Sequence, residues 1–318
     1  MPRRGLLNRL LRLREASILA VGIVLVVYFR AANPYFLTDA NLETLSQFIA
    51  ATAIIACGEI MLLICGEIDL SAGHVFALAP FVMHFLDEAG LPMPAALVLA
   101  LGGCAVVGLI NGLITVRLRV PSFVTTLGTF SLLNGFTLTI SHGSPVETGD
   151  EGGFADAFGA GGYSEIIWAV AIALGVHFVL RQTRWGLYTI AAGGNPEGAA
   201  EAGIRVGRIK VGNFVLTSVL GGFAGILEAF RIGSTDPLAG GTAIMFLAVA
   251  AGVIGGTPLA GGSGTVLGGL VGAAVLGVLR DGFTLQGINA FTFDMILGAA
   301  ILVAMVANIH VGRLRRRV

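Results

Sequence analysis

Apolar runs of about the length of a membrane-spanning helix follow one another along most of this 318-residue sequence. A helix needs about 20 mostly apolar residues to cross the hydrocarbon core of a bilayer, and ten runs approach that length. The sequence therefore predicts an all-α, polytopic membrane protein with a single transmembrane domain over residues 1–318. The expected spans are residues 16–36, 43–64, 70–86, 93–116, 121–141, 164–181, 211–230, 243–260, 264–281 and 289–309.

Composition supports this class and excludes others. Hydrophobic residues make up 55% of the chain and charged residues 12%, whereas a soluble domain has about 25% charged residues. If this chain were a soluble domain, it would have too few charged residues to cover its surface. A disordered chain is also excluded, because it needs high net charge and few large apolar residues. The formal net charge is +0, which leaves no surplus of lysine and arginine for a phosphate backbone. We therefore expect membrane lipid, and no nucleic acid, as a partner.

The basic residues indicate how the chain is oriented, because lysine and arginine are enriched in short cytoplasmic loops. All but three of the 19 basic residues lie near the two termini, at residues 117–119 or in residues 181–210. The exceptions are Arg30, Arg231 and Arg280, each at the edge of a span. Segments on the opposite side carry aspartate and glutamate instead. Both termini are therefore predicted to be cytoplasmic, which requires an even number of spans.

The segment between the second and third apolar runs departs from ordinary membrane sequence. It places two carboxylates close to hydrocarbon, where a charge costs about 2.5–3.5 kcal/mol and usually has a partner or a function. Its glycines allow a helix to break, which is tolerated where the break faces protein or a water-filled cavity. The alternative is an ordinary cytoplasmic turn in which Asp69 or Ser71 caps the third helix. The candidate residues of this helix-break motif are Gly66, Glu67, Asp69, Ser71 and Gly73.

A second polar segment, residues 120–129, opens the fifth apolar run. Pro121 suits the first turn of a helix, where its missing N–H costs nothing. Thr125, Thr126 and Thr129 place hydroxyls on nearby turns. These hydroxyls could line a polar pathway, or they could bond to carbonyls one turn back in their own helix. Pro121, Thr125 and Thr129 are therefore candidate pathway residues.

The third feature is a short capped helix within a predicted cytoplasmic loop, residues 182–210. Asn195 suits the N-cap, Pro196 the first helical position, and Gly203 a left-handed residue that ends the helix. An acidic residue in the first turn favours the positive end of the helix. Such a helix could dock onto a partner, or it could be a surface helix without one. The candidate coupling residues are Asn195, Pro196, Glu197, Glu201 and Gly203.

Glycine is frequent from residue 252 to residue 282. This stretch does not form a Gly-x-x-x-x-Gly-Lys-Ser/Thr phosphate loop, because the single lysine of the chain is Lys210. The glycines instead suit the close packing of helices in lipid. Residues 64–66 and 254–256 are also similar, and a leucine and a glycine follow each at similar spacing, which suggests an internal repeat.

Four motifs, in this order, resemble those of the permease subunits of the ribose-type sugar importers of the ATP-binding cassette superfamily. The family pattern Gly-Gly-Ile-Asp-Leu-Ser-x-Gly is matched at residues 66–73, with Glu67 in place of the second glycine. Val-Pro-x-Phe-x-x-Thr-Leu-Gly-Thr is matched at residues 120–129. The loop pattern that ends in Ala-x-Gly-Gly-Asn is matched at residues 183–195, and the glycine-rich pattern at residues 255–265. Related nucleoside permeases also carry Gly-Glu-Ile at the first motif, so a nucleoside-type permease is an alternative.

The resemblance implies a role in an ATP-driven importer of a monosaccharide or related polyol, in the inner membrane of a bacterium. Two permease chains, identical or paralogous, would form the pathway. A periplasmic substrate-binding protein would deliver the substrate, and cytoplasmic ATPase subunits would grip the helix near residues 195–203. No cofactor is expected in this chain, because ATP and Mg would bind the ATPase. The chain is not expected to be an enzyme, since it has no phosphate loop, no His-Glu-x-x-His and no Gly-x-Ser-x-Gly.

A rival interpretation is an ion-coupled secondary transporter that works alone. Carboxylates inside membrane spans can bind protons or sodium ions. The candidates for such a role are Glu59, Glu67, Asp69, Glu228 and Asp294.

Overall fold

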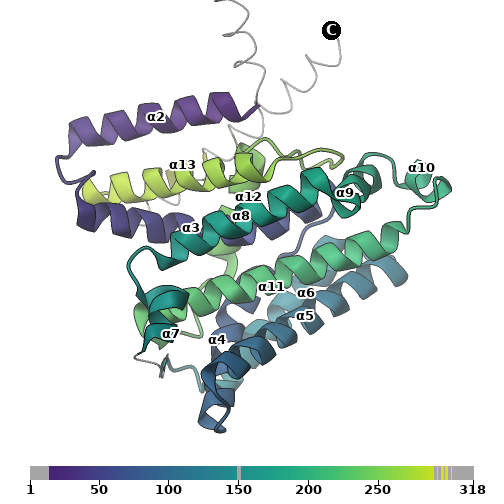
Figure 1. The fold of residues 1–318 in the computed structure, drawn as a ribbon, viewed down its shortest axis with the longest axis horizontal. Helices are drawn as coiled ribbons and strands as arrows, with labels where there is room; N and C mark the ends of the chain where they lie inside the picture. Colours follow the sequence, from purple (N-terminus) through teal and green to yellow (C-terminus); the bar gives the residue numbers. More distant parts are fainter. Residues whose placement is uncertain are drawn as a thin grey trace, which may run out of the picture.

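The computed structural model of the protein describes residues 14–148 and 152–289, with a few isolated positions between 292 and 302. The described chain is almost entirely helical (Figure 1), and six of its helices are long and apolar enough to cross a membrane. The all-α, polytopic class predicted from the sequence is therefore confirmed. The expected span 289–309 and its Asp294 lie outside the described residues. The six long helices are α3 (Asp39–Ile64), α5 (Met93–Arg117), α6 (Ser122–Ile140), α8 (Ser164–Gln182), α11 (Val206–Ile232) and α13 (Val266–Leu285).

Shorter elements complete the described chain. Three helices correspond in position to further expected spans: α2 (Arg14–Ala32), α4 (Ala72–Glu88) and α12 (Gly241–Ile254). The remaining elements are α7 (Gly153–Ala155), η1 (Asp156–Ala160), α9 (Arg184–Gly194), α10 (Pro196–Glu201) and the paired strands β1 (Val146–Glu147) and β2 (Ser234–Thr235).

Two expectations about boundaries are wrong. Residues 182–210 were expected to be a loop with one short helix, but they hold α9, α10 and the first turn of α11. The span expected at 243–260 ends at Ile254, because the next residues turn away from the helix. Gly256 adopts a positive φ of 97° and its N–H donates to the carbonyl of Val253, a common way for a helix to end.

The end of α3 has the same geometry as the end of α12. Gly66 adopts a φ of 74°, its N–H donates to the Leu63 carbonyl, and the Glu67 N–H donates to the Leu62 carbonyl. This pair of bonds is the Schellman arrangement, which satisfies carbonyls left free at a helix end. In both helices a left-handed glycine therefore stops the helix and redirects the chain.

The helix α3 lies in the middle of the molecule and α11 packs against α3, α4 and α5. Ile54, Ile55 and Met61 of α3 are fully buried. Large apolar side chains are exposed on other helices, for example Val98 and Leu132, as expected of surfaces that contact lipid rather than water. Figure 1 shows α9 and α10 at one end of the helix stack and α7 at the other.

Candidate functional site

The break between α3 and α4, residues 65–71, is built into the interior of the protein. The Gly66 and Glu67 N–H groups bond to the end of α3, and the next three N–H groups donate to side chains of α3 and α6. Irregular backbone among membrane helices is tolerated where the protein satisfies its hydrogen bonds. The pairs are Ile68 with Ser122 Oγ at 3.3 Å, Asp69 with Glu59 Oε2 at 3.4 Å, and Leu70 with Thr126 Oγ1 at 3.1 Å.

Asp69 lies at the centre of a buried polar network. Its Oδ1 accepts hydrogen bonds from the Ser71 N–H at 2.9 Å and from the Ser71 hydroxyl at 2.6 Å. Asn111 Nδ2 lies 3.5 Å from both carboxylate oxygens and donates to Ser71 Oγ at 2.9 Å. Ser218 Oγ lies 3.4 Å from Oδ2. The carboxylate thus joins the start of α4 to α5 and α11.

The alternative interpretation of this turn was that Asp69 or Ser71 caps the helix that follows, α4. Ser71 occupies the N-cap of α4, but its side chain makes no capping hydrogen bond. Asp69 accepts from Ser71 itself and from side chains of other helices. Asp69 therefore fixes the path of the turn and ties it to its neighbours, instead of capping the first turn of α4.

The two glycines of this motif have different roles. Gly66 makes the turn at the end of α3. Gly73 lies within α4, where a Cβ atom would stand 1.9 Å from the carbonyl oxygen of Gly241 at the start of α12. The expectation that Gly73 allows the helix to break is therefore wrong. Gly73 instead permits close packing of α4 against α12.

The predicted residues at the start of α6 divide into two groups. Thr129 donates to Asn111 Oδ1 at 2.6 Å and so extends the Asp69 network. The Thr125 hydroxyl is buried without a hydrogen-bond partner in the described part of the chain. Pro121 stands at the N-cap, one residue before the helix begins at Ser122, and not in its first turn. Of these three residues, only Thr129 is linked to Asp69 by side-chain hydrogen bonds, and the link passes through Asn111.

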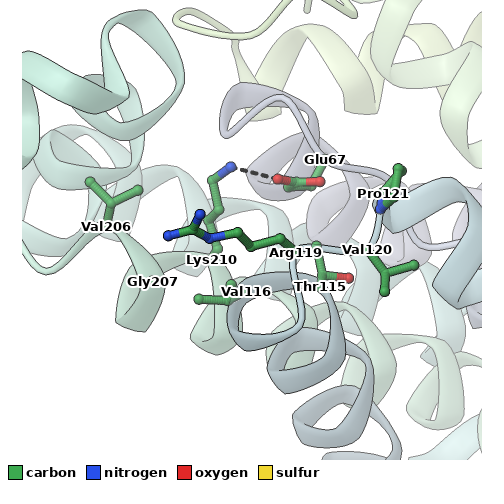
Figure 2. A pocket seen from close by; sticks show the side chains of 9 residues that line it. All are labelled: Glu67, Thr115, Val116, Arg119, Val120, Pro121, Val206, Gly207 and Lys210. Carbon is green, nitrogen blue, oxygen red and sulfur yellow. Dashed lines mark hydrogen bonds and ion pairs between the residues drawn. The ribbon is translucent and has the colours of Figure 1, made fainter.

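Glu67 points away from this network and pairs with Lys210 of α11. Both side chains are largely buried, with exposed fractions of 13% and 20%. The pair lies in a pocket of about 350 Å³ that Arg119 and Pro121 also line. Figure 2 shows the lysine and the glutamate joined across this pocket, with Arg119 beside them. The acid that replaces the second glycine of the motif therefore ties the helix break to the start of α11.

The helix α10 is capped as the sequence predicts. Asn195 Oδ1 accepts from the Gly198 N–H at 3.0 Å, and Pro196 is the first helical residue. Gly203 ends the helix with a φ of 83° and donates to the Ala200 carbonyl. Glu197 and Glu201, the two acidic side chains of this helix, are exposed.

The helix α9 connects α10 to the helix break. A Cβ atom on Gly193 would stand 1.6 Å from the Ile64 carbonyl oxygen, so the two backbones touch. The same carbonyl accepts the Gly262 N–H at 2.8 Å. Asn213 donates to the Met61 carbonyl at 3.3 Å and to Cys65 Sγ at 3.2 Å. A displacement of α9 would therefore press directly on the last turn of α3.

Several residues of this site escaped the sequence analysis. They are polar residues inside apolar helices or partners far away along the chain. A polar residue in a membrane span is itself a signal of function or of pairing, and it would have pointed to most of them. The missed residues are Glu59 as a backbone acceptor, Asn111, Ser122, Lys210, Asn213 and Ser218.

Among the described residues, no group of three or more His, Cys, Asp or Glu side chains could hold a metal ion. The arrangement instead combines a buried polar network with helices that can transmit movement to it. An exposed capped helix contacts, through α9, a hydrogen-bonded break in the middle of the helix stack. The helical fold defines a multi-pass membrane protein.

Comparison with known proteins identifies the family. Residues 41–305 match the family described as "branched-chain amino acid transport system / permease component", and the chain therefore belongs to it. The chain is 36% identical to the xylose/arabinose import permease protein XylH of Sulfolobus acidocaldarius, with 94% of this chain and 86% of that protein covered. It is 35% identical to the ribose import permease protein RbsC of Escherichia coli, with 92% and 93% covered.

The galactose/methyl galactoside import permease protein MglC of Escherichia coli is 37% identical, with 92% of this chain and 93% of that protein covered. The resemblance to permeases of sugar importers is thereby confirmed. These relatives are transport permeases and not enzymes. No solved structure gives a significant match to the chain.

Proposed function

We propose that this chain is the membrane pathway subunit of an ATP-driven importer of a monosaccharide or related polyol. The observation that carries the proposal is similarity along almost the whole chain to permeases named for xylose/arabinose, ribose and galactose import. A nucleoside-type permease of the same superfamily is the nearest alternative, because Glu67 gives the first motif its Gly-Glu-Ile form.

The proposal divides the work among several subunits. A separate cytoplasmic ATPase binds ATP and Mg and hydrolyses the nucleotide, and a periplasmic binding protein delivers the substrate. A second permease chain, identical or paralogous, completes the pathway. The localisation is the inner membrane of a bacterium, and the chain crosses it several times.

The exposed helix α10 is the proposed docking element for the ATPase. Its Asn195 cap and its Gly203 end hold the short helix rigid, and Glu197 and Glu201 offer acidic side chains to a partner. When the ATPase subunits close on ATP, α10 moves with them. Because α9 directly precedes α10 in the chain and touches Ile64, the movement reaches the helix break and its Asp69 network.

The proposed topology has ten spans with both termini in the cytoplasm. Its support is the agreement between charge and position: Arg119, two residues after α5, lines a pocket with Val206 and Gly207 at the start of α11, the helix that follows α10. The acidic Glu147 and Asp156 belong to elements at the opposite end. An internal repeat is proposed on the matching ends of α3 and α12, each with a left-handed glycine and the same pair of bonds.

A second candidate, the ion-coupled transporter, has one structural observation in its favour. Two buried carboxyl groups lie close together, because Glu59 accepts from the N–H of Asp69. Such a pair inside a membrane protein is a candidate proton site. Its predicted consequence is transport by this chain alone, which separates it from the leading proposal.

Reconstitution tests both candidates. The purified chain in liposomes should take up none of D-xylose, D-ribose or D-galactose under a proton or sodium gradient. With its ATPase, its binding protein and internal ATP, the same liposomes should take up at least one monosaccharide or related polyol. Uptake driven by a gradient without the ATPase would contradict the proposal, and so would ATP-driven uptake of a nucleoside in place of a sugar.

A further inference from the structure

A second pocket, of about 260 Å³, lies between α3, α4, α11, α12 and α13. Its residues come from the first half of α3, the last turns of α11, the start of α12 and the last part of α13. The helix α9 touches the opposite end of α3 at Ile64, and α10 packs against α11, which begins nearby in the chain at Val206. This pocket, which we call the external pocket, therefore belongs to the side that the proposed topology assigns to the outside.

We propose that the external pocket binds one neutral monosaccharide as it enters the permease. The inference rests on the proposed function, because a transported sugar must occupy some site between the binding protein and the cytoplasm. The size of the pocket suits this ligand. Sites for drug-sized molecules have volumes of about 300–1,000 Å³, so a pocket of about 260 Å³ fits a smaller molecule such as one sugar ring.

The polar groups in the external pocket match the hydroxyls of a sugar. Arg231 and Glu228 stand side by side, with Nη2 and Oε1 3.6 Å apart, and both line the pocket. A guanidinium donates in a planar fork and a carboxylate accepts, so the two can bind adjacent hydroxyls that both donate and accept. Gln47 adds an amide with a donor and an acceptor.

The charges around the external pocket favour a neutral ligand over an anion. Glu165 packs behind Arg231, with Oε2 3.3 Å from Nε, and is only 3% exposed. Arg231 and Arg280 therefore face Glu228 and Glu165, and these four formal charges sum to zero. A sugar phosphate would bring uncompensated negative charge, whereas an uncharged polyol keeps the ion pairs intact and gains hydrogen bonds to charged groups, which are stronger than neutral ones.

Apolar surface completes the pocket. Phe48 and Phe76 both line it, and Phe76 is buried. The Arg280 guanidinium lies over the Phe48 ring, 4.5 Å from its centroid, which holds this cation at the wall. A sugar has an apolar face of C–H groups as well as hydroxyls, so it matches a wall that combines rings with charged groups. The ammonium and carboxylate of a branched-chain amino acid could replace the ion pair between Glu228 and Arg231, but its aliphatic side chain would offer no partner to the Gln47 amide.

Protection of an introduced cysteine tests the site independently of transport. Ala243 lines the external pocket, and the three native cysteines are buried. The Ala243→Cys variant of the full chain, in right-side-out membrane vesicles, is labelled with a membrane-impermeant maleimide. We expect D-xylose, D-ribose or D-galactose to slow labelling about threefold when present at about twice its dissociation constant. L-Leucine, a neutral molecule without a polyol, should not slow it.

The matched control is Ser144→Cys, an exposed position outside the pocket, whose labelling none of these compounds should change. Gln47→Leu in the Ala243→Cys chain removes the amide and should abolish protection. Protection by leucine, protection at position 144, or a cysteine at 243 that the maleimide does not reach would each overturn the inference.

Uptake measured with the ATPase and binding protein tests the proposed transport function separately from the proposed sugar site. ATP-driven sugar uptake without protection of position 243 by any transported sugar would overturn the binding site but leave the proposed function intact. Protection by a sugar that the assembled complex never transports would support the site and contradict the proposed function.

Discussion

Asp69 shows how a buried acid in this protein is stabilised by many weak partners rather than by one cation. Its carboxylate meets the Ser71 N–H and hydroxyl, the Asn111 amide and the Ser218 hydroxyl. Hydrogen bonds to a charged group contribute about 1.5–3 kcal/mol each, and leaving such donors unpaired in the interior costs a similar amount. The network therefore depends on a side chain at position 69 that only accepts hydrogen bonds.

The Asp69→Asn variant should impair transport without preventing membrane insertion. Asparagine keeps one acceptor but turns an NH₂ group towards donors on Asn111 or Ser218, so we expect a loss of about 1–3 kcal/mol in the free energy of unfolding. ATP-driven uptake and thermal unfolding in detergent measure the two effects. Asp236→Asn is the control, because Asp236 is exposed and its bond to the Leu238 N–H at 2.8 Å survives in asparagine. Unchanged uptake in Asp69→Asn would restrict Asp69 to shaping the turn.

The sequence predicted that Asp69 is special but not what it touches. Carboxylates near hydrocarbon are visible in the sequence because they break an apolar pattern. Their partners are single polar residues such as Asn111 and Ser218, which share no spacing with Asp69 and meet it only when α5 and α11 pack. The same limit applied to Glu67, whose partner Lys210 lies 143 residues further along the chain.

At the scale of elements, local signals decided which helices could be predicted. The apolar runs of α3 and α5 are long enough to identify themselves, and α10 carries its own caps. The helix α9 was missed because it is short and contains three glycines. Its N-cap is Thr183, whose side chain accepts the Gly186 N–H. Its packing against Cys65 supplies apolar burial that the sequence does not reveal.

The contact between α9 and α3 predicts different outcomes for two neighbouring glycines. In Gly193→Ala the new methyl group would stand 1.6 Å from the Ile64 carbonyl oxygen, so we expect a loss of about 1–3 kcal/mol from overpacking and reduced ATP-driven uptake. In Gly194→Ala the nearest atom is Gly262 Cα at 3.7 Å, an ordinary contact. Thermal unfolding and uptake of both variants provide the comparison, and equal effects would exclude a close α9–α3 contact.

The docking role of α10 predicts that Glu197→Arg uncouples transport from ATP hydrolysis. Glu197 is exposed in the first turn, where an arginine opposes the helix dipole and reverses the charge offered to the ATPase. We expect co-purification of the ATPase to fall about tenfold, equivalent to about 1.4 kcal/mol of binding free energy. Glu147→Arg should retain the ATPase, because this exposed acid lies in β1, which pairs with β2 just beyond the C-terminal end of α11. Normal association in Glu197→Arg would contradict docking through this helix.

At the scale of the whole molecule, apolar length and the placement of charge could be inferred from the sequence, since both are sums over many residues and tolerate local errors. The short elements between spans could not be, because β1 pairs with β2 across 88 residues of chain and η1 is set by its packing against α11. Because α10 and α7 lie at opposite ends of the helix stack (Figure 1), the basic and acidic segments are expected at opposite faces of a membrane.

Those faces can be identified with two single cysteines. Ser144 lies near β1 and Ala202 closes α10, and both are exposed. In intact cells or right-side-out vesicles, an impermeant maleimide should label Ser144→Cys at once, and Ala202→Cys only after the membrane is opened, because arginine and lysine cluster on the cytoplasmic side. The buried Cys57, Cys65 and Cys104 keep the background low. Labelling of both positions from one side would contradict the topology, and with it the assignment of α10 to the ATPase and of the external pocket to incoming sugar.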